Sequence, residues 1–301
     1  MKKTDPTRKR LPEKLVGLDP LLEIVETAIY SSYLADTIPI SVILIGPSGA
    51  GKSKAIMQYK GTNGCHLTND VTSMGLQDIL GSDKENKIRF LVVPDFNVVL
   101  SHRASTLQLT VANLLSVTSE GTVRIDDGRE KKELKHAPIG ILTAMTRDLY
   151  ARIANKWAIL GFSRRFMPIY YEYTLETRQL IQESIVNGGT TLLQLVPRIM
   201  NTPRAIISNT LIGEYGDRIR LISDELATNI GYVPSYSKRN VASTGKSAFI
   251  GKQLEFTPHL ALRTMARAHA LRAERKDVND ADIKFLMDMI SFTRFDRPGM
   301  L

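Results

Sequence analysis

Apolar and polar positions in the first half of the chain follow one another as strands and helices do in α/β proteins. Residues 20–34 repeat apolar side chains every three to four positions, which predicts a helix, and 107–115 shows the same helical pattern. The stretch 120–136 predicts a hairpin whose turn is Asp126-Asp127-Gly128. Short, nearly continuous apolar runs predict buried strands at 41–45, 88–96, 138–145 and 166–173.

After Thr174 the pattern becomes mainly helical, which predicts a division of the chain at that point. A stretch rich in Ser and Gly within it predicts a long exposed loop at about 231–252. The expected organisation is a basic N-terminal arm at 1–14, an α/β core at 15–174 and a helical domain at 175–301. Within the helical domain, helices are expected at 175–185, 192–200, 259–275 and 280–292.

The segment LIGPSGAGKS, residues 44–53, carries the most specific motif. A predicted strand runs into a GxxxxGKS pattern whose Lys52 and Ser53 begin a helix, which is the context of a phosphate loop. The glycines allow successive backbone N–H groups to point into one concavity, and the helix N-terminus adds partial positive charge. Lys52 is expected to contact the outer phosphates and the Ser53 hydroxyl to bind Mg²⁺. The residues expected to bind the nucleotide are Gly46, Pro47, Ser48, Gly49, Ala50, Gly51, Lys52 and Ser53.

The composition favours a negatively charged partner. The chain has 40 Lys and Arg against 31 Asp and Glu, a formal net charge of +9. A basic protein of this size is attracted to nucleic acids or anionic surfaces, and DNA is the partner expected. Basic residues gather in the N-terminal arm and in the 231–252 stretch, where Lys238, Arg239 and Lys246 lie near Tyr236.

Membrane and disulfide-bonded secreted classes are not expected. No apolar run approaches the roughly 18 residues that a membrane span requires, and the basic start is not followed by the apolar stretch of a secretory signal. The single cysteine, Cys65, excludes an internal disulfide and favours a reducing cytoplasm.

The order of the motifs resembles that of AAA+ ATPases, most closely the branch with MoxR-type, magnesium-chelatase and minichromosome-maintenance ATPases. LLSVTSEGTVRIDDG is similar to that branch's helix and hairpin, IGILTAMT to its sensor-1 strand and FSRRFMPI to its arginine-finger box. FTPHLALRTMARAHALRAERKDVNDADIKFL is similar to its last lid helices, and FLVVPDFNVVLS also resembles AAA-type ATPases of mobile elements. The resemblance covers roughly 15–175 and 256–292, and it implies an AAA+ core at 15–174 with a helical lid at 175–301.

The resemblance implies roles for residues at two strand ends. Asp95 is expected to hold Mg²⁺ through water, and Thr146, with Thr143 as the alternative, is expected to orient the attacking water. Two registers of this motif are possible. In the first, Asp95 directs the metal, and the next residue, usually a catalytic Glu, is Phe96. In the second, Asp95 takes the Glu position and Pro94 replaces the metal ligand. Both registers predict slow basal hydrolysis, and in the first a Phe96→Glu change is expected to raise the rate.

Two further arginines are expected at the nucleotide. Arg165, with Arg164 as the alternative, takes the arginine-finger position and would reach the γ-phosphate of a neighbouring subunit. His259 stands where the family places its sensor-2 arginine, so Arg263, one turn later, is the candidate for that contact. A finger that acts between subunits implies head-to-tail contacts, which close into rings or continue as filaments.

These observations together predict an ATP- and Mg²⁺-dependent ATPase that forms a homo-oligomer, either a hexameric ring or a helical filament. Its expected work is remodelling of DNA, movement along it or loading of a partner onto it. One alternative is a MoxR-like remodeller of a protein partner. Another is an ATP-controlled assembly switch that loads a nuclease or recombinase and hardly turns over ATP.

Overall fold

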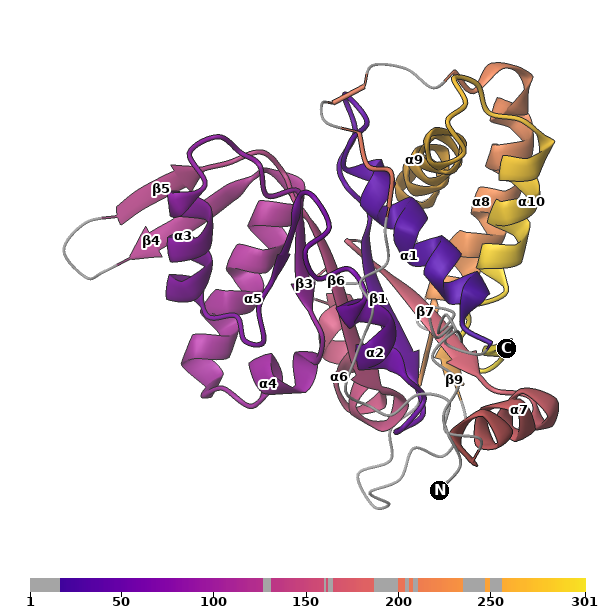
Figure 1. Cartoon of the computed structure of the whole chain (residues 1–301). Helices are drawn as coiled ribbons and strands as arrows, with labels where there is room; N and C mark the ends of the chain where they lie inside the picture. The colour runs from indigo at the N-terminus through magenta and orange to yellow at the C-terminus, as the bar shows by residue number, and fades with distance from the viewer. Residues whose placement is uncertain are drawn as a thin grey trace, which may run out of the picture.

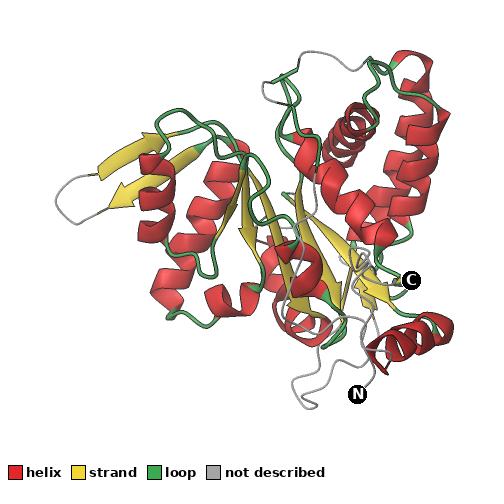
Figure 2. Cartoon of the chain, in the orientation of Figure 1, coloured by secondary structure: helices red, strands yellow, loops and turns green. Residues whose placement is uncertain are grey.

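The chain is an α/β protein with a parallel sheet flanked by helices and followed by a C-terminal helical region (Figure 1, Figure 2). Its structure is a computed structural model. The residues that it describes are 17–126, 131–159, 161, 165–186, 200–203, 206–207, 211–234, 247–249 and 256–301.

The sheet has six strands in the order β10-β7-β1-β6-β3-β2, and each neighbouring pair is parallel. β1 lies between β6 and β7, with Gly46 opposite Thr146 of β6. Because the strands are parallel, their carboxyl ends meet at one edge of the sheet, where ligands bind in open α/β folds. The strands are β1 (Ser41–Gly46), β2 (Cys65–Leu67), β3 (Phe90–Val93), β6 (Gly140–Thr146), β7 (Phe166–Glu172) and β10 (Gly299–Met300).

Alternate residues of the strands pack against different helices. In β1, Val42 and Leu44 belong to a first apolar cluster, which includes α1 and α2, whereas Ile43 and Ile45 belong to a second, which includes α3 to α6. All four side chains are buried, as expected for a parallel sheet covered on both faces. The helices are α1 (Asp19–Ser31), α2 (Lys52–Met57), α3 (Ser73–Ser82), α4 (Phe96–Leu100), α5 (Ala104–Ser119) and α6 (Arg147–Ile159).

The C-terminal helices continue the first apolar cluster. Leu262 and Met265 of α9 and Leu286 of α10 are fully buried in it together with α1, which contacts both the sheet and α9. The chain then returns to the sheet, where Gly299 and Met300 form the edge strand beside β7. No helix in the described ranges is long and apolar enough to cross a membrane. The helices are α7 (Leu175–Val186), η2 (Gly213–Tyr215), α8 (Gly216–Ile230), α9 (Phe256–Arg272) and α10 (Asp280–Ile290).

The predicted strands are confirmed as β1, β3, β6 and β7, and the predicted hairpin is confirmed as β4 (Thr122–Asp126) and β5 (Lys131–Lys135). It projects beside α3, away from α8 to α10 (Figure 1). The helical patterns at both ends of the chain correspond to α1, α9 and α10. Several elements were not predicted: β2, α3, α4, α6, α8 and β10.

Three other predictions concern segments that the structure describes only in part. The 231–252 stretch is not a loop throughout, because its ends pair as β8 (Tyr232–Pro234) and β9 (Ser247–Phe249). The basic residues between these strands, the N-terminal arm and most of 192–200 lie outside the described residues. The division after Thr174 follows the end of β7 and stays a prediction, although the C-terminal strand β10 returns to the sheet.

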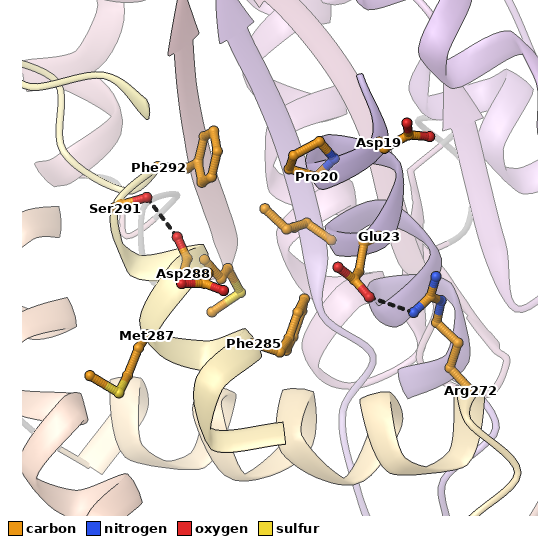
Figure 3. A pocket seen from close by; sticks show the side chains of 11 residues that line it. Asp19, Pro20, Glu23, Arg272, Phe285, Met287, Asp288, Ser291 and Phe292 are labelled. Atoms are coloured by element: carbon orange, nitrogen blue, oxygen red, sulfur yellow. Dashed lines mark hydrogen bonds and ion pairs between the residues drawn. The ribbon is translucent and has the colours of Figure 1, made fainter. Parts of the chain in front are cut away.

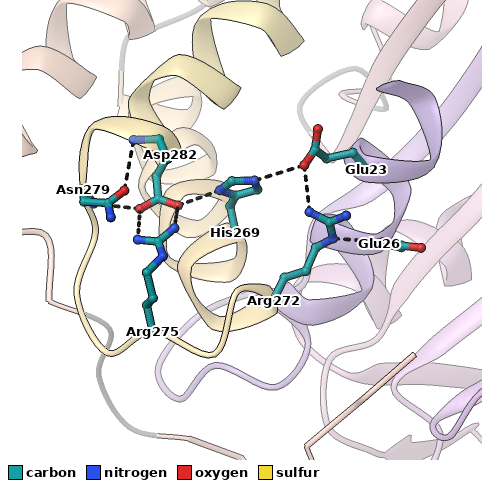
Figure 4. A network of polar contacts seen from close by, with 8 residues as sticks. Glu23, Glu26, His269, Arg272, Arg275, Asn279 and Asp282 are labelled. Atoms are coloured by element: carbon teal, nitrogen blue, oxygen red, sulfur yellow. Dashed lines mark hydrogen bonds and ion pairs between the residues drawn. The ribbon is translucent and has the colours of Figure 1, made fainter. Parts of the chain in front are cut away.

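A polar network ties α1 to the C-terminal helices (Figure 4). The His269 ring, stacked on Phe285, lies with Nδ1 2.6 Å from an Asp282 oxygen and Nε2 3.3 Å from a Glu23 oxygen. Burial disfavours the charged ring, but the hydrogen bonds with Asp282 and Glu23 outweigh it and raise the pKa of His269. The charged groups of this network are Glu23 and Glu26 of α1, His269 and Arg272 of α9, Arg275, and Asp282 of α10.

The raised pKa of His269 makes the stability of this polar network sensitive to pH. Its stabilisation is fully present below the unfolded-state pKa, near 6.5, and is lost as the pH rises through the raised folded-state value. We expect the free energy of unfolding, measured with urea, to fall on the order of 1 kcal/mol more for the wild type than for His269→Gln between pH 6 and 9. Parallel pH profiles for the two proteins would contradict this assignment.

Candidate functional site

The predicted phosphate loop connects β1 to α2 at the carboxyl edge of the sheet. Gly49 and Gly51 have φ angles of +76° and +73°, a backbone region that favours glycine. Gly51 is the N-cap of α2, which begins at Lys52 as predicted but has only 6 residues. The two glycines, rather than a long helix, therefore set the shape of the loop.

The polar backbone groups of the loop fall into two sets. The carbonyl oxygens of Gly46 and Pro47 accept hydrogen bonds from Lys52 Nζ at 3.0 and 2.5 Å. The Ala50 carbonyl accepts two tyrosine hydroxyls at 2.8 and 2.9 Å, and the Ala50 N–H donates to Pro47 at 3.4 Å. By contrast, several N–H groups donate to no protein acceptor in the described part of the chain: those of Ser48, Gly49, Gly51, Lys52 and Ser53. The carbonyls of Gly46, Pro47 and Ala50 are thus already bonded, whereas these N–H groups are available to a ligand.

Lys52 supplies a cation inside this loop. Its side chain is buried, and its ammonium is bonded to the two neutral carbonyls. Burial lowers the pKa of Lys52, and the negative charge of Asp95 partly opposes that effect. Because hydrogen bonds to a charged acceptor are stronger than those to a carbonyl, a phosphate oxygen would compete well for this ammonium.

Ser53 and Asp95 lie where α2 meets the end of β3. The Ser53 hydroxyl donates to the Pro94 carbonyl at 3.2 Å, and the Asp95 carboxylate accepts from the Asn97 N–H at 3.0 Å. The structure therefore brings Lys52, Ser53 and Asp95 together as predicted. Within the described ranges, no three His, Cys, Asp or Glu residues are grouped to hold a metal. A cation here would need phosphate oxygens among its ligands, which is how Mg²⁺ binds beside nucleotides.

Phe96 faces away from the phosphate loop. Its ring is fully buried in the second apolar cluster, on the sheet face opposite α2, in edge-to-face contact with Trp157 at a centroid distance of 5.5 Å. A glutamate at this position would place a carboxylate in the core rather than beside a nucleotide. The expectation that Phe96→Glu accelerates hydrolysis stays a prediction, and the burial of this ring adds that the change should cost stability.

The two candidate threonines of β6 occupy different environments. Thr146 is paired with Gly46, so it lies beside the first residue of the phosphate loop. Thr143 is paired with Ile43 and Val93 and is fully buried, and its hydroxyl has no hydrogen-bond partner among the described residues. Of the two, Thr146 is the one placed to contact a bound nucleotide.

Arg165 lies at the opposite edge of the sheet. It directly precedes β7, whose first residue, Phe166, is paired with Ser41 at the start of β1. Gly46 follows five residues later, roughly 17 Å along the strand. This separation exceeds the reach of an arginine side chain, so Arg165 can act on a nucleotide only across a subunit contact. The alternative, Arg164, lies outside the described residues.

The cationic stripe on α9 is present, but no described contact joins it to the phosphate loop. Arg263 is exposed, whereas His259 and Arg267 are half-buried. Burial, and then the charge of Arg263, lowers the pKa of both neighbours. Arg220 of α8 adds to the effect on His259. The predicted nucleotide contact of Arg263 stays a prediction.

Tyr171 and Tyr173, which sequence reasoning did not select, contact the loop directly. Their hydroxyls are the two that donate to the Ala50 carbonyl. The available signal was the alternation in FMPIYYEY, which places residues 171 and 173 on one face of a strand. That pattern does not show that the tyrosines contact the phosphate loop.

A cavity of about 660 Å³ lies between α1 and α10 (Figure 3). Glu23 and Arg272 form an ion pair on one side of it, with Phe285 and Phe292 among its apolar lining residues. No residue of the phosphate loop lines this cavity. It is therefore separate from the candidate nucleotide site.

Comparison with known proteins identified no relative of this chain. No protein-family model matches the chain, and neither does any curated protein. The structure establishes an α/β fold with a parallel sheet and a glycine-rich loop at its carboxyl edge.

Proposed function

We propose that this chain is an AAA+-type ATPase that binds ATP at the phosphate loop and uses it to assemble and to act on DNA. The observation that carries the proposal is the polarity of the loop. The carbonyls of Gly46, Pro47 and Ala50 are bonded to Lys52 and the two tyrosines, whereas five N–H groups of the loop have no acceptor in the described ranges and lie beside a buried ammonium. Such a nest of donors suits a polyanion, and the GxxxxGKS spacing favours a nucleoside triphosphate.

Mg²⁺ would be held by Ser53, by Asp95 through water and by phosphate oxygens. The hydrogen bond from Ser53 to Pro94 supports this assignment, because it joins the first turn of α2 to the strand end that carries Asp95. The cation would neutralise charge that develops on the phosphates. The chain's own contribution is to fix the hydroxyl and the carboxylate on two adjacent elements.

Hydrolysis is proposed to be slow in the isolated chain. Thr146 lies beside Gly46 and would orient a water, but the residue after Asp95, where the resemblance implies a catalytic Glu, is Phe96, whose ring is buried on the other face of the sheet. A positioned general base contributes about 10²- to 10⁴-fold to such reactions, and this one is missing from its usual place. ATP would then serve largely as an assembly signal unless a partner supplies the missing group.

Assembly is proposed to be head-to-tail. Arg165 and the phosphate loop lie at opposite edges of the sheet, so one subunit's arginine would meet the next subunit's nucleotide. Such heterologous contacts close into a ring, by family resemblance a hexamer, or continue as a filament.

Action on DNA rests on the charge of +9 and on the resemblance to helicase-like ATPases. The basic residues expected to contact DNA, including Lys238 and Arg239, lie outside the described residues. The alternatives are remodelling of a protein partner and ATP-controlled loading of a nuclease or recombinase. Stimulation of hydrolysis by DNA favours action on DNA, and stimulation only by a protein favours remodelling of a protein partner. Assembly with ATP but without turnover favours the loading switch.

The nucleotide site is tested by removing its cation. Lys52→Ala should weaken ATP binding about 10- to 100-fold in calorimetric titration, because a charge-assisted contact of about 1.5–3 kcal/mol is lost. Lys60→Ala removes the same charge from an exposed position nearby and should bind ATP normally. Equal ATP affinity in all three proteins would overturn the assignment.

The shared site is tested by mixing two inactive variants. Arg165→Ala should bind ATP yet lose ATPase activity, whereas exposed Arg103→Ala should keep both. In an equimolar mixture of Arg165→Ala and Lys52→Ala, about a quarter of the interfaces combine an intact loop with an intact finger. Activity should return to about that fraction of the wild-type level. A mixture that co-assembles but stays inactive would argue against a site between subunits.

A further inference from the structure

Tyr171 of β7 and Tyr173, one residue past the end of this strand, contact the phosphate loop directly. The two hydroxyls donate to the same acceptor, the Ala50 carbonyl, at 2.8 and 2.9 Å. A carbonyl oxygen has two lone pairs, so this acceptor is saturated. The two tyrosines are two residues apart in sequence, at and just past the end of β7, and their hydroxyls converge on a single peptide unit.

The direction of the Ala50 carbonyl determines the direction of the Gly51 N–H. The Ala50 oxygen and the Gly51 N–H belong to one planar trans peptide, so they point to opposite sides of the backbone. Holding the oxygen against the tyrosines therefore aims the Gly51 N–H away from β7. That N–H is one of the loop donors without a protein acceptor in the described ranges.

A glycine loop needs such a restraint. Gly49 and Gly51 both have positive φ, and glycine peptides rotate easily because no Cβ limits them. The tyrosines also border the loop sterically. A Cβ built on Gly46 would lie 3.1 Å from the Tyr171 ring, and one on Gly51 would lie 3.6 Å from the Tyr173 hydroxyl. The loop is thus held at both its start and its end by the same two side chains.

The tyrosines are themselves firmly placed. Tyr171 is fully buried, pairs with Gly299 of β10, and packs edge-to-face on Tyr173 with ring centroids 6.0 Å apart. Burial raises the pKa of Tyr171 well above its usual value and that of Tyr173 to about 12. Both hydroxyls consequently stay protonated, and able to donate, at any pH used for an assay.

We propose that Tyr171 and Tyr173 are positioning residues that clamp the Ala50–Gly51 peptide so that its N–H is directed at the phosphates of a bound nucleotide. The inference rests on the proposed nucleotide site and adds two residues from a strand that the phosphate-loop motif does not include. Neither tyrosine needs to touch the nucleotide, because the restraint is passed through a single peptide plane.

The clamp predicts a specific pattern of binding losses. Tyr171→Phe and Tyr173→Phe keep both rings and should each weaken binding of ATP and of inorganic triphosphate about two- to threefold. The double variant should lose about tenfold or more, beyond the product of the single losses, because each single variant leaves one donor on the carbonyl. Tyr170→Phe removes a hydroxyl from the same strand but on the opposite sheet face, and it should bind both ligands normally.

Calorimetric titration and thermal unfolding of the nucleotide-free proteins separate the clamp from a general packing role. The expected result is weakened triphosphate binding with melting temperatures that stay within about 2 °C of the Tyr170→Phe control. Normal triphosphate binding by the double variant would overturn the clamp, and so would a binding loss that only parallels a fall in stability. If Lys52→Ala loses ATP binding while the double variant keeps it, the clamp fails and the nucleotide site stands. If the wild type binds neither ligand, both proposals fail.

Discussion

Parallel pairing of β1 with β6 and β7 is the constraint on which the rest of the structure depends. This pairing sets Gly46 beside Thr146 and carries Tyr171 to the start of the phosphate loop. Pairing of β6 with β3 then brings the end of β3, and with it Asp95, to the same edge. Since both sheet faces are buried, a shift of one residue would exchange the two apolar clusters and dismantle the site.

The loop at this edge suits phosphates, on our proposal, because several of its acceptors are already satisfied while donors remain available. Lys52, Tyr171 and Tyr173 bond the carbonyls of Gly46, Pro47 and Ala50, and N–H groups of the loop have no acceptor in the described ranges. The same sheet also separates two functions in space. Arg165 lies at the amino edge and the loop at the carboxyl edge, so a site that uses both must form between subunits.

Local patterns identified most of the core and the loop from the sequence. The strands were readable because buried parallel strands are continuously apolar, and the loop because its glycine spacing is specific. The direction of the Phe96 side chain could not be predicted from the sequence, since it depends on which sheet face α4 covers. The clamp was missed for a similar reason: residues 50 and 171 are far apart in sequence and meet only through β-strand register. The contributions of the N-terminal arm and the 235–246 segment stay predictions, because these residues lie outside the described ranges.

The central claim is that unpaired backbone donors of the phosphate loop bind the phosphates of ATP. Amide ¹H–¹⁵N spectra of the labelled protein, recorded with and without ATP and Mg²⁺, test it most directly. The amides of Gly49, Gly51 and Lys52 should shift strongly and exchange more slowly with solvent when the nucleotide is saturating. Unchanged loop amides under saturating ATP, with shifts confined to another region such as the cavity between α1 and α10, would contradict the claim.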